Sequence, residues 1–273
     1  MIDLHLIGIG TGNPDHLTRA AVRAMNAADL ILLPRKSDAK SDLIDLRRMI
    51  CVEVLTGSTR VIEFDLPERD AHAPYREAVE RWHDAIAMAW TAQIARHLPD
   101  GGSLALLVWG DPSLYDSTLR IADRLRAGGM EIAVSVVPGI SSVQALTAAH
   151  AIPLNTLAEP VLITTGRRLR AGGGQAGGWP SDINTLAVLL DGDCAFATIN
   201  PEGVTIWWGA YLGMPQESLV TGNLSEVGTE IVHRRAALRE RHGWIMDIYI
   251  LRRERRSGDT EAPSRFPTAA AGA

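Results

Sequence analysis

Three short stretches of the sequence combine glycine with side chains that can bind a small molecule. They are Gly8-Ile-Gly-Thr-Gly12, Gly110-Asp-Pro112 and Val137-Pro-Gly-Ile-Ser-Ser142. Glycine lets a ligand approach the main chain closely and tolerates a positive φ. Asp111 adds a carboxylate, and Ser141 is a natural cap for a helix whose first amide groups face a ligand at the turn. Each stretch alone is also typical of a structural turn, so a binding site requires that folding bring them together.

The residues before Asp111 predict where its carboxylate lies in the fold. Leu104-Ala-Leu-Leu-Val108 is an unbroken apolar run, which is typical of a strand buried on both faces of a sheet. Pro112 cannot continue a hydrogen-bonded ladder, so the strand ends near Gly110. Asp111 therefore follows the carboxyl end of a central strand, where open α/β sheets bind their ligands.

The first residues of the chain predict a β-α-β unit. A strand at residues 4–9 runs into the glycine-rich stretch, and a helix capped by Asp15 or Thr18 follows it. A second strand at residues 29–33 ends at Pro34. Strand, helix and strand in this order predict a parallel pair with a helical crossover.

The rest of the chain mostly continues this alternation. The predicted helices are 42–56, 75–98, 117–127, 141–150 and 201–212, and the predicted strands are 60–64, 131–137, 161–165, 185–190, 218–221, 229–232 and 244–251. From Thr221 to Leu251 the alternation is lost, which predicts antiparallel pairing. The glycine-rich residues 171–178 are expected to be mobile.

We therefore expect an α/β fold of two α/β domains with a ligand cleft between them. The first domain, residues 1–114, has a mostly parallel sheet, and the second, residues 115–252, has a mixed one. Residues 253–273 are rich in charge, proline, alanine and glycine and are predicted to be disordered.

Composition excludes several classes of protein. The chain has 273 residues and a net charge of −5, which argues against a nucleic-acid partner. No apolar run approaches the roughly 20 residues that span a bilayer. The N-terminus shows no basic signal-peptide region, and two distant cysteines, Cys51 and Cys194, suggest neither a disulfide framework nor a metal site. A reduced, cytoplasmic setting is expected.

A nicotinamide-dependent oxidoreductase is an alternative that the first glycine-rich stretch raises. The dinucleotide fingerprint requires a third glycine where this chain has Asn13, and an acidic residue where the second strand ends at Leu33-Pro34. Both mismatches disfavour this alternative. A non-catalytic ligand-binding module is a further one.

In their order and spacing, the three glycine-marked stretches resemble those of the tetrapyrrole (corrin/porphyrin) methyltransferases, and the resemblance covers most of residues 1–251. It implies S-adenosylmethionine as cofactor, bound in a folded shape between two domains largely through main-chain groups. Many relatives have a proline where this chain has Thr11. The implied cofactor-binding residues are Thr11, Trp109, Gly110, Asp111, Ser141, Ser142, Leu190, Asp191, Leu224 and Ser225. For Asp111 we expect a bond with the methionine ammonium or the ribose rather than a role as base.

The resemblance also implies a substrate, a macrocycle with several carboxylates. Arginine forks and lysines pair with carboxylates, so the expected substrate-binding residues are the cations at strand ends: Arg35, Lys36, Lys40, Arg167 and Arg168. No metal is implied, and relatives commonly form homodimers.

Within the family, the stretches Gly110–Thr118 and Leu189–Phe196 are most similar to the branch that methylates precorrin-5 at C1 and releases acetate. Methylation at another precorrin carbon, such as C11 or C20, is the alternative. Acetate release requires water to attack a ketone, which needs a base and an oxyanion partner. By position, the candidate catalytic residues are Tyr115, Asp116, His150 and, as a further carboxylate, Glu159.

Overall fold

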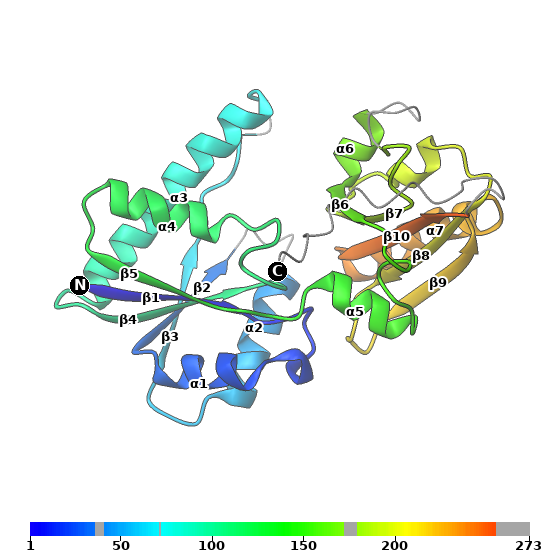
Figure 1. Ribbon diagram of the computed structural model, residues 1–273. Coiled ribbons are helices and arrows are strands. Elements are labelled where there is room, and N and C mark those ends of the chain that lie inside the picture. Colours follow the sequence, from blue (N-terminus) through cyan, green and yellow to red (C-terminus); the bar gives the residue numbers. More distant parts are fainter. Residues whose placement is uncertain (36–40, 71, 172–178, 255–273) are drawn as a thin grey trace, which may run out of the picture.

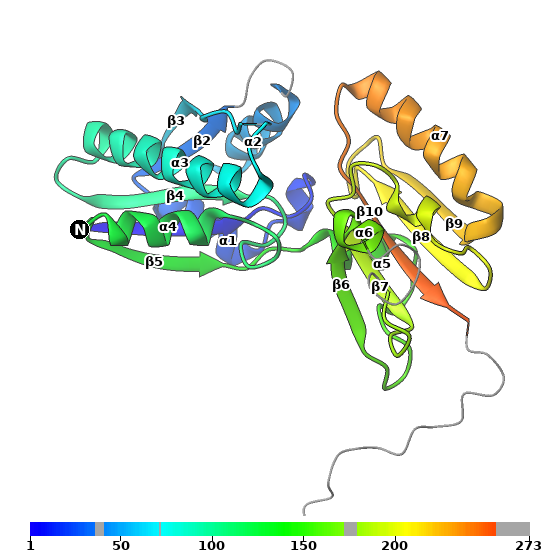
Figure 2. The ribbon, with the colours of Figure 1, turned by 90° about the horizontal axis from the view of Figure 1, so that it is seen from above.

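The computed structural model describes residues 1–35, 41–70, 72–171 and 179–254. The predictions for Lys36, Lys40, the glycine-rich segment and most of the C-terminal tail lie outside these ranges. Two five-stranded sheets organise the chain into two lobes that lie side by side (Figures 1 and 2). Among the described residues, no helix combines the length and apolar character that a membrane crossing requires.

The first lobe is a parallel sheet with helices on both faces, in the strand order β3-β2-β4-β1-β5. Its elements are β1 (Ile2–Gly8), α1 (Arg19–Ala27), β2 (Leu30–Arg35), α2 (Ser41–Val54), β3 (Arg60–Asp65), α3 (Tyr75–His97), β4 (Gly102–Val108), α4 (Thr118–Ala127) and β5 (Ile132–Val137). Thr18 caps α1, since its side chain accepts a hydrogen bond from the Ala21 N–H at 3.0 Å.

Side-chain alternation along the central strands decides which helices cover which face. Leu104 and Leu106 of β4 belong to the core cluster beneath α3 and α4, whereas Ala105 and Leu107 belong to the cluster beneath α1 and α2. The sequence of a strand that is buried on both faces is a continuous apolar run. The central strand predicted from that run is therefore confirmed, and its carboxyl end carries Trp109, Gly110 and Asp111.

The second lobe is a mixed sheet in the order β6-β7-β10-β8-β9. Its elements are α5 (Ser142–Ala149), β6 (Val161–Thr165), α6 (Gly166–Ala171), β7 (Thr185–Leu189), β8 (Val204–Ala210), β9 (Ser218–Asn223), α7 (Leu224–His242) and β10 (Asp247–Arg253). β6 and β7 are parallel, and the other pairs are antiparallel, as predicted for the end of the chain. α6 and α7 pack on one face of this sheet and α5 on the other.

The domain boundary at residues 114 and 115 does not match the sheets. β5 pairs in parallel with β1, from Ile2 opposite Ile132 to Ile7 opposite Val137, and α4 packs against α3. Residues 118–137 therefore belong to the first lobe, and the chain crosses to the second lobe after β5. The physical reason is that the edge of the first sheet beside β1 offers unpaired backbone groups, which β5 satisfies.

Two further predictions are wrong. Residues 201–212, predicted as a helix, hold β8, where Val204, Ile206 and Trp208 are buried at a period of two. Residues 229–232, predicted as a strand, lie inside α7, where Leu224, Ile231 and Arg235 form a buried helical stripe. α7 ends at Gly243, whose φ of 71° suits a helix C-terminus. β10 extends through Arg253, one residue beyond the predicted end of the second domain.

Candidate active site

The three glycine-marked bends meet at the carboxyl ends of β1, β4 and β5. Gly10 and Gly110 exchange backbone hydrogen bonds, with N···O distances of 2.7 and 3.4 Å. A Cβ on Gly139 would lie 2.1 Å from the carbonyl oxygen of Gly110, and a Cβ on Gly8 would lie 2.5 Å from the Gly139 nitrogen. No side chain fits at either position. The glycines therefore let three loops, remote in sequence, touch through their main chains.

Asp111 joins the second bend to the third. One carboxylate oxygen accepts a hydrogen bond from the Gly139 N–H at 3.0 Å, and the other accepts one from the Ser113 N–H at 2.8 Å. Burial alone would raise the pKa of this carboxyl, but the hydrogen bonds from Ser113 and Gly139 outweigh burial and lower it. Asp111 is therefore ionised at neutral pH and holds the bends in place.

Ser141 and Ser142 begin α5 at the same place. Ser141 is buried, and its hydroxyl accepts a hydrogen bond from the Val143 N–H at 3.2 Å. Ser142 is half-buried and occupies the first turn of the helix. Beside them, a Cβ on Gly110 would meet only Ser141 Cα, at 3.7 Å, so this side of Gly110 is open. Main-chain groups and a helix N-terminus thus lie around one open glycine face.

Thr11 connects the first bend to the second lobe. Its buried hydroxyl donates to the carbonyl of Leu212 at 2.8 Å and lies 2.9 Å from Nδ1 of His16. Close by, the Cβ position of Gly12 is 2.0 Å from the Met214 methyl carbon. Thr11 of the first lobe therefore has a hydrogen-bond partner in the second lobe.

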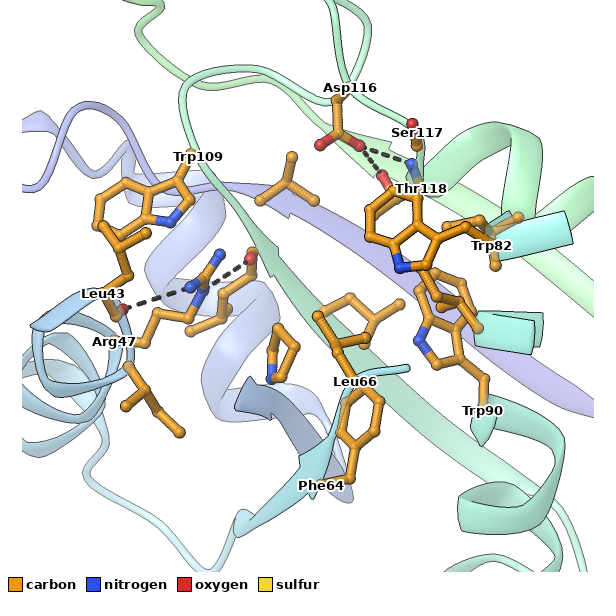
Figure 3. A pocket seen from close by; sticks show the side chains of 17 residues that line it. Leu43, Arg47, Phe64, Leu66, Trp82, Trp90, Trp109, Asp116, Ser117 and Thr118 are labelled. Atoms are coloured by element: carbon orange, nitrogen blue, oxygen red, sulfur yellow. Dashed lines mark hydrogen bonds between the residues drawn. The ribbon is translucent and has the colours of Figure 1, made fainter. Parts of the chain in front are cut away.

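A cavity of about 200 Å³ adjoins the bends in the first lobe (Figure 3). Its wall includes Arg47 of α2, Trp82 and Trp90 of α3, Trp109 after β4, and Asp116 before α4. Trp109 directly precedes Gly110 and also packs against the core of the second lobe. The cavity wall therefore reaches the residue that directly precedes the glycine cluster.

Arg47 places a buried positive charge in the wall of this cavity. It is 9% exposed, its Nε donates to the Leu107 carbonyl at 3.2 Å, and one terminal nitrogen donates to the Leu43 carbonyl at 3.3 Å. Its guanidinium lies 5.0 Å from the ring centre of Trp109. Burial lowers the pKa of Arg47 to about 10, while the negative charge of Asp116 opposes that shift. Arg47 therefore remains a buried cation at neutral pH.

The remaining predicted cofactor residues lie in the second lobe. Leu190, at the end of β7, is 68% exposed with a φ of 52°. Asp191 is buried and accepts hydrogen bonds from the Ala195 N–H at 2.5 Å and the Tyr249 hydroxyl at 2.6 Å. Leu224 is buried at the start of α7, and Ser225 beside it is exposed. The Asp191 carboxylate therefore hydrogen-bonds to groups of the protein, the Ala195 N–H and the Tyr249 hydroxyl.

The predicted substrate-binding cations lie on different elements, Arg35 on β2 and Arg167 and Arg168 on α6. Arg35 ends β2 and pairs with Asp65 at 2.7 Å. Arg167 lies in the first turn of α6, with its guanidinium 3.6 Å from the ring centre of Tyr75 at the start of α3, and so contacts the other lobe. Arg168 is exposed in the same turn. Lys36 lies outside the described residues.

The candidate catalytic residues differ in their hydrogen bonds and in their position relative to the cavity. The Tyr115 hydroxyl donates to the Ile163 carbonyl at 2.9 Å, and His150 Nε2 lies 3.0 Å from the Trp208 carbonyl. One carboxylate oxygen of Asp116 accepts from the Thr118 N–H at 2.6 Å, which caps α4, while the side chain lines the cavity. Glu159 lies in the loop before β6, away from that cavity's wall. Of the four, Asp116 faces the cavity.

Arg47 was not among the predicted site residues, although the sequence carries a signal for it. Ile44, Arg47 and Cys51 follow helical spacing on the buried side of α2, so an arginine occupies a core position. A buried cation is costly unless something compensates it, and such a position therefore indicates function.

Comparison with known proteins identifies the family. The family model for tetrapyrrole (corrin/porphyrin) methylases matches residues 3–228. A precorrin-6A synthase [deacetylating] from Sinorhizobium sp is 44% identical over 251 residues, which is 91% of this chain and 94% of that protein. The crystal structure of a cobalamin-synthesis-related protein (CobF) from Corynebacterium diphtheriae shares 39% identity and a TM-score of 0.78, covering 93% of this chain and 99% of its own.

A more distant structure shows the same fold. The uroporphyrin-III C-methyltransferase from Thermus thermophilus, solved with S-adenosylhomocysteine, is 21% identical with a TM-score of 0.56 and covers 91% of each chain. The predicted two-domain α/β fold is confirmed, and S-adenosylmethionine is the methyl donor of the family. The nicotinamide-dependent alternative is set aside, because the match extends over most of both lobes. The chain is a member of the tetrapyrrole (corrin/porphyrin) methylase family.

Proposed function

We propose that this methylase converts precorrin-5 to precorrin-6A, methylating C1 and releasing acetate. The observation that carries the proposal is the 44% identity to the deacetylating precorrin-6A synthase over nearly the full length of both proteins. The CobF structure, which shares 39% identity and almost the whole fold, supports it. By comparison, the similarity to a precorrin-2 C(20)-methyltransferase is 29% over 55% of this chain, which gives that alternative less support.

The glycine cluster is suited to hold the cofactor. The open face of Gly110 allows a ligand to approach the main chain, and the N-terminus of α5 beside it presents amide groups. We propose that Trp109, Gly110, Asp111, Ser141 and Ser142 form this side of the site, with Leu190, Asp191, Leu224, Ser225 and Thr11 contributing from the second lobe and the first bend. When bound, S-adenosylmethionine supplies a methyl group on a sulfonium, ready for a nucleophilic carbon.

The protein's own contribution to methyl transfer is placement. In-line transfer requires the donor and the acceptor carbon to be held in near-attack geometry, and little further chemistry is needed. The bends that Asp111 ties together are rigid because their main chains are in contact. We propose that the exposed cations Arg35, Arg167 and Arg168, together with Lys36, pair with the carboxylates at the edge of a macrocycle.

The assembly and location of the protein are part of the same proposal. We propose a homodimer, as the family resemblance implies, in the cytoplasm, which the two distant cysteines favour. Light scattering after size-exclusion chromatography measures the assembly directly, and a mass near 29.5 kDa, that of one chain, would contradict the dimer.

The reaction is tested with precorrin-5 and S-adenosylmethionine labelled in its methyl group. We expect one labelled methyl group in the corrinoid product and one free acetate for each turnover. A methylated product without acetate would assign the protein to a different precorrin carbon. Calorimetry with S-adenosylhomocysteine and with NAD tests the cofactor, and binding of NAD alone would contradict the proposal.

A further inference from the structure

The wall of the cavity includes two tryptophans, Trp90 and Trp109, whose indole N–H groups have no hydrogen-bond partner within residues 1–35, 41–70, 72–171 and 179–254 of the protein, and a buried cation, Arg47. In the same ranges no carboxylate lies within 4.0 Å of the Arg47 guanidinium. A buried donor without a hydrogen-bond partner destabilises the folded protein. Donors retained at that cost in a cavity indicate a ligand that accepts hydrogen bonds.

The size of the cavity limits what that ligand can be. About 200 Å³ is far less than a tetrapyrrole macrocycle requires, but it accommodates one short substituent and a water, whose share of liquid volume is about 30 Å³. Most of the wall is apolar, with Trp82, Leu66 and Phe64 among its residues, and Ser117 and Thr118 add polar groups beside Asp116 (Figure 3). A small group with an apolar end and one oxygen therefore fits best.

The presence of Asp116 in the cavity wall favours a neutral carbonyl over a carboxylate as the substrate group that binds there. Its carboxylate lines the same cavity and acts on the charge of Arg47. A permanently negative substituent would be repelled by Asp116, whereas a ketone carries no charge until water attacks it. A base and a cation that line one cavity are the two groups that such an attack requires.

Building on the function proposed above, we propose that this cavity is where the acetyl group is removed. Asp116 is the base that activates water, and Arg47, with the indole N–H of Trp109, stabilises the oxyanion. Of the earlier candidates, this assigns the hydrolytic role to Asp116 and leaves Tyr115 and His150 with the structural hydrogen bonds that they make.

In the proposed step, water cleaves the bond between the acetyl group and the ring carbon. Asp116 takes one proton from water, and the water oxygen bonds to the acetyl carbonyl carbon, whose oxygen becomes an alkoxide facing Arg47. As the carbonyl re-forms, the bond between the acetyl carbon and the ring carbon breaks, and its electron pair stays on the ring. The ring carbon takes up the proton from Asp116, so a ketone and water give a ring C–H bond and acetic acid. Where methyl transfer is to that same carbon, the electron pair bonds to the methyl group instead, and Asp116 releases its proton to the solvent.

The test measures acetate release from precorrin-5 in single turnovers, with S-adenosylhomocysteine affinity measured separately by calorimetry. Asp116→Asn retains an oxygen that can accept from Thr118, so the cap of α4 is preserved. Arg47→Lys retains the charge but loses the guanidinium fork. Matched controls are Asp123→Asn and Arg126→Lys, which alter an exposed ion pair on α4.

We expect acetate release to slow about 100-fold or more in Asp116→Asn and Arg47→Lys, with KM and S-adenosylhomocysteine affinity changed less than about threefold. Added formate should restore release in Asp116→Ala by replacing the missing base. The controls should match the wild type.

Wild-type acetate release in both variants would overturn the proposal. So would an unchanged kcat with a large rise in KM, because the cavity would then bind a substrate carboxylate instead of processing an acetyl group. A wild-type protein that forms neither methylated product nor acetate would instead refute the proposed function, which separates the two failures.

Discussion

The carboxylate of Asp111 accepts a hydrogen bond from the backbone N–H of Gly139 at 3.0 Å, across 28 positions in the sequence. This bond links the loop after β4 to the loop after β5 and so sets the relation between Gly110 and the N-terminus of α5. The Asp111 carboxylate therefore has a structural role, because its hydrogen bonds hold two loops of the site together. Any contact that Asp111 makes with a cofactor depends on this arrangement.

Replacing Asp111 with Asn should destabilise the protein in a pH-dependent manner. The hydrogen bonds lower the pKa of Asp111 from its usual 3.8, so their stabilisation is fully present above that value and is lost as the pH falls through the lower pKa of the folded state. The loss should be about 1 kcal/mol at neutral pH, since the group is partly exposed and screened. Urea unfolding of both proteins should differ at pH 7 and converge in strong acid. A difference that persists unchanged in acid would contradict this account.

Gly139→Ala should disrupt the site more severely than its size suggests. The new methyl group would lie 2.1 Å from the Gly110 carbonyl oxygen, and backbone atoms cannot swing aside as a flexible side chain can. We expect a loss of about 3 kcal/mol or more in unfolding free energy, or displaced loops with weakened binding of S-adenosylhomocysteine. Gly57→Ala is the matched control, because no atom lies within 4 Å of its Cβ position. Equal stability and binding in the two variants would be incompatible with the contact described.

Thr11→Val should weaken the contact between the lobes. The variant has a similar shape but leaves the Leu212 carbonyl without the hydroxyl that donates to it at 2.8 Å. An unsatisfied buried acceptor costs about 1–3 kcal/mol, so the melting temperature should fall. Thr11→Ser keeps the hydroxyl and should retain most of that stability. If serine and valine were equally destabilising, the loss would come from packing rather than from the hydrogen bond.

Cys51 and Cys194 should resist alkylation in the folded protein. Burial raises the pKa of each thiol to about 11, and for Cys51 the nearby Arg47 offsets part of that shift. At pH 8 a thiol of pKa 11 is about 0.1% thiolate, roughly 200-fold less than a free cysteine. Mass spectrometry after brief iodoacetamide treatment should find both residues unmodified in native protein and both modified in urea. Rapid native labelling of either one would show that its site opens readily.

Much of the fold follows from local pattern. The apolar run at Leu104–Val108 predicts a central strand because a strand covered on both faces has no polar alternation to show. Thr18 as helix cap and the turn at Gly110-Asp111-Pro112 follow from what those residue types can do locally. The same local reasoning fails at β8, whose buried residues alternate although a helix is predicted for residues 201–212, and at residues 229–232, where β-branched residues lie in a helix.

The sequence by itself determined which segments are buried, where the chain must bend, and, through three glycine-marked stretches, the family. Only the tertiary structure decided that β5 returns to the first sheet, that Gly8, Gly110 and Gly139 touch, and that Arg47 is buried in the wall of the cavity. The physical reason is range: periodicity and turn chemistry act over a few residues. Strand partners, backbone contacts and the surroundings of a buried charge depend on segments far apart in the chain.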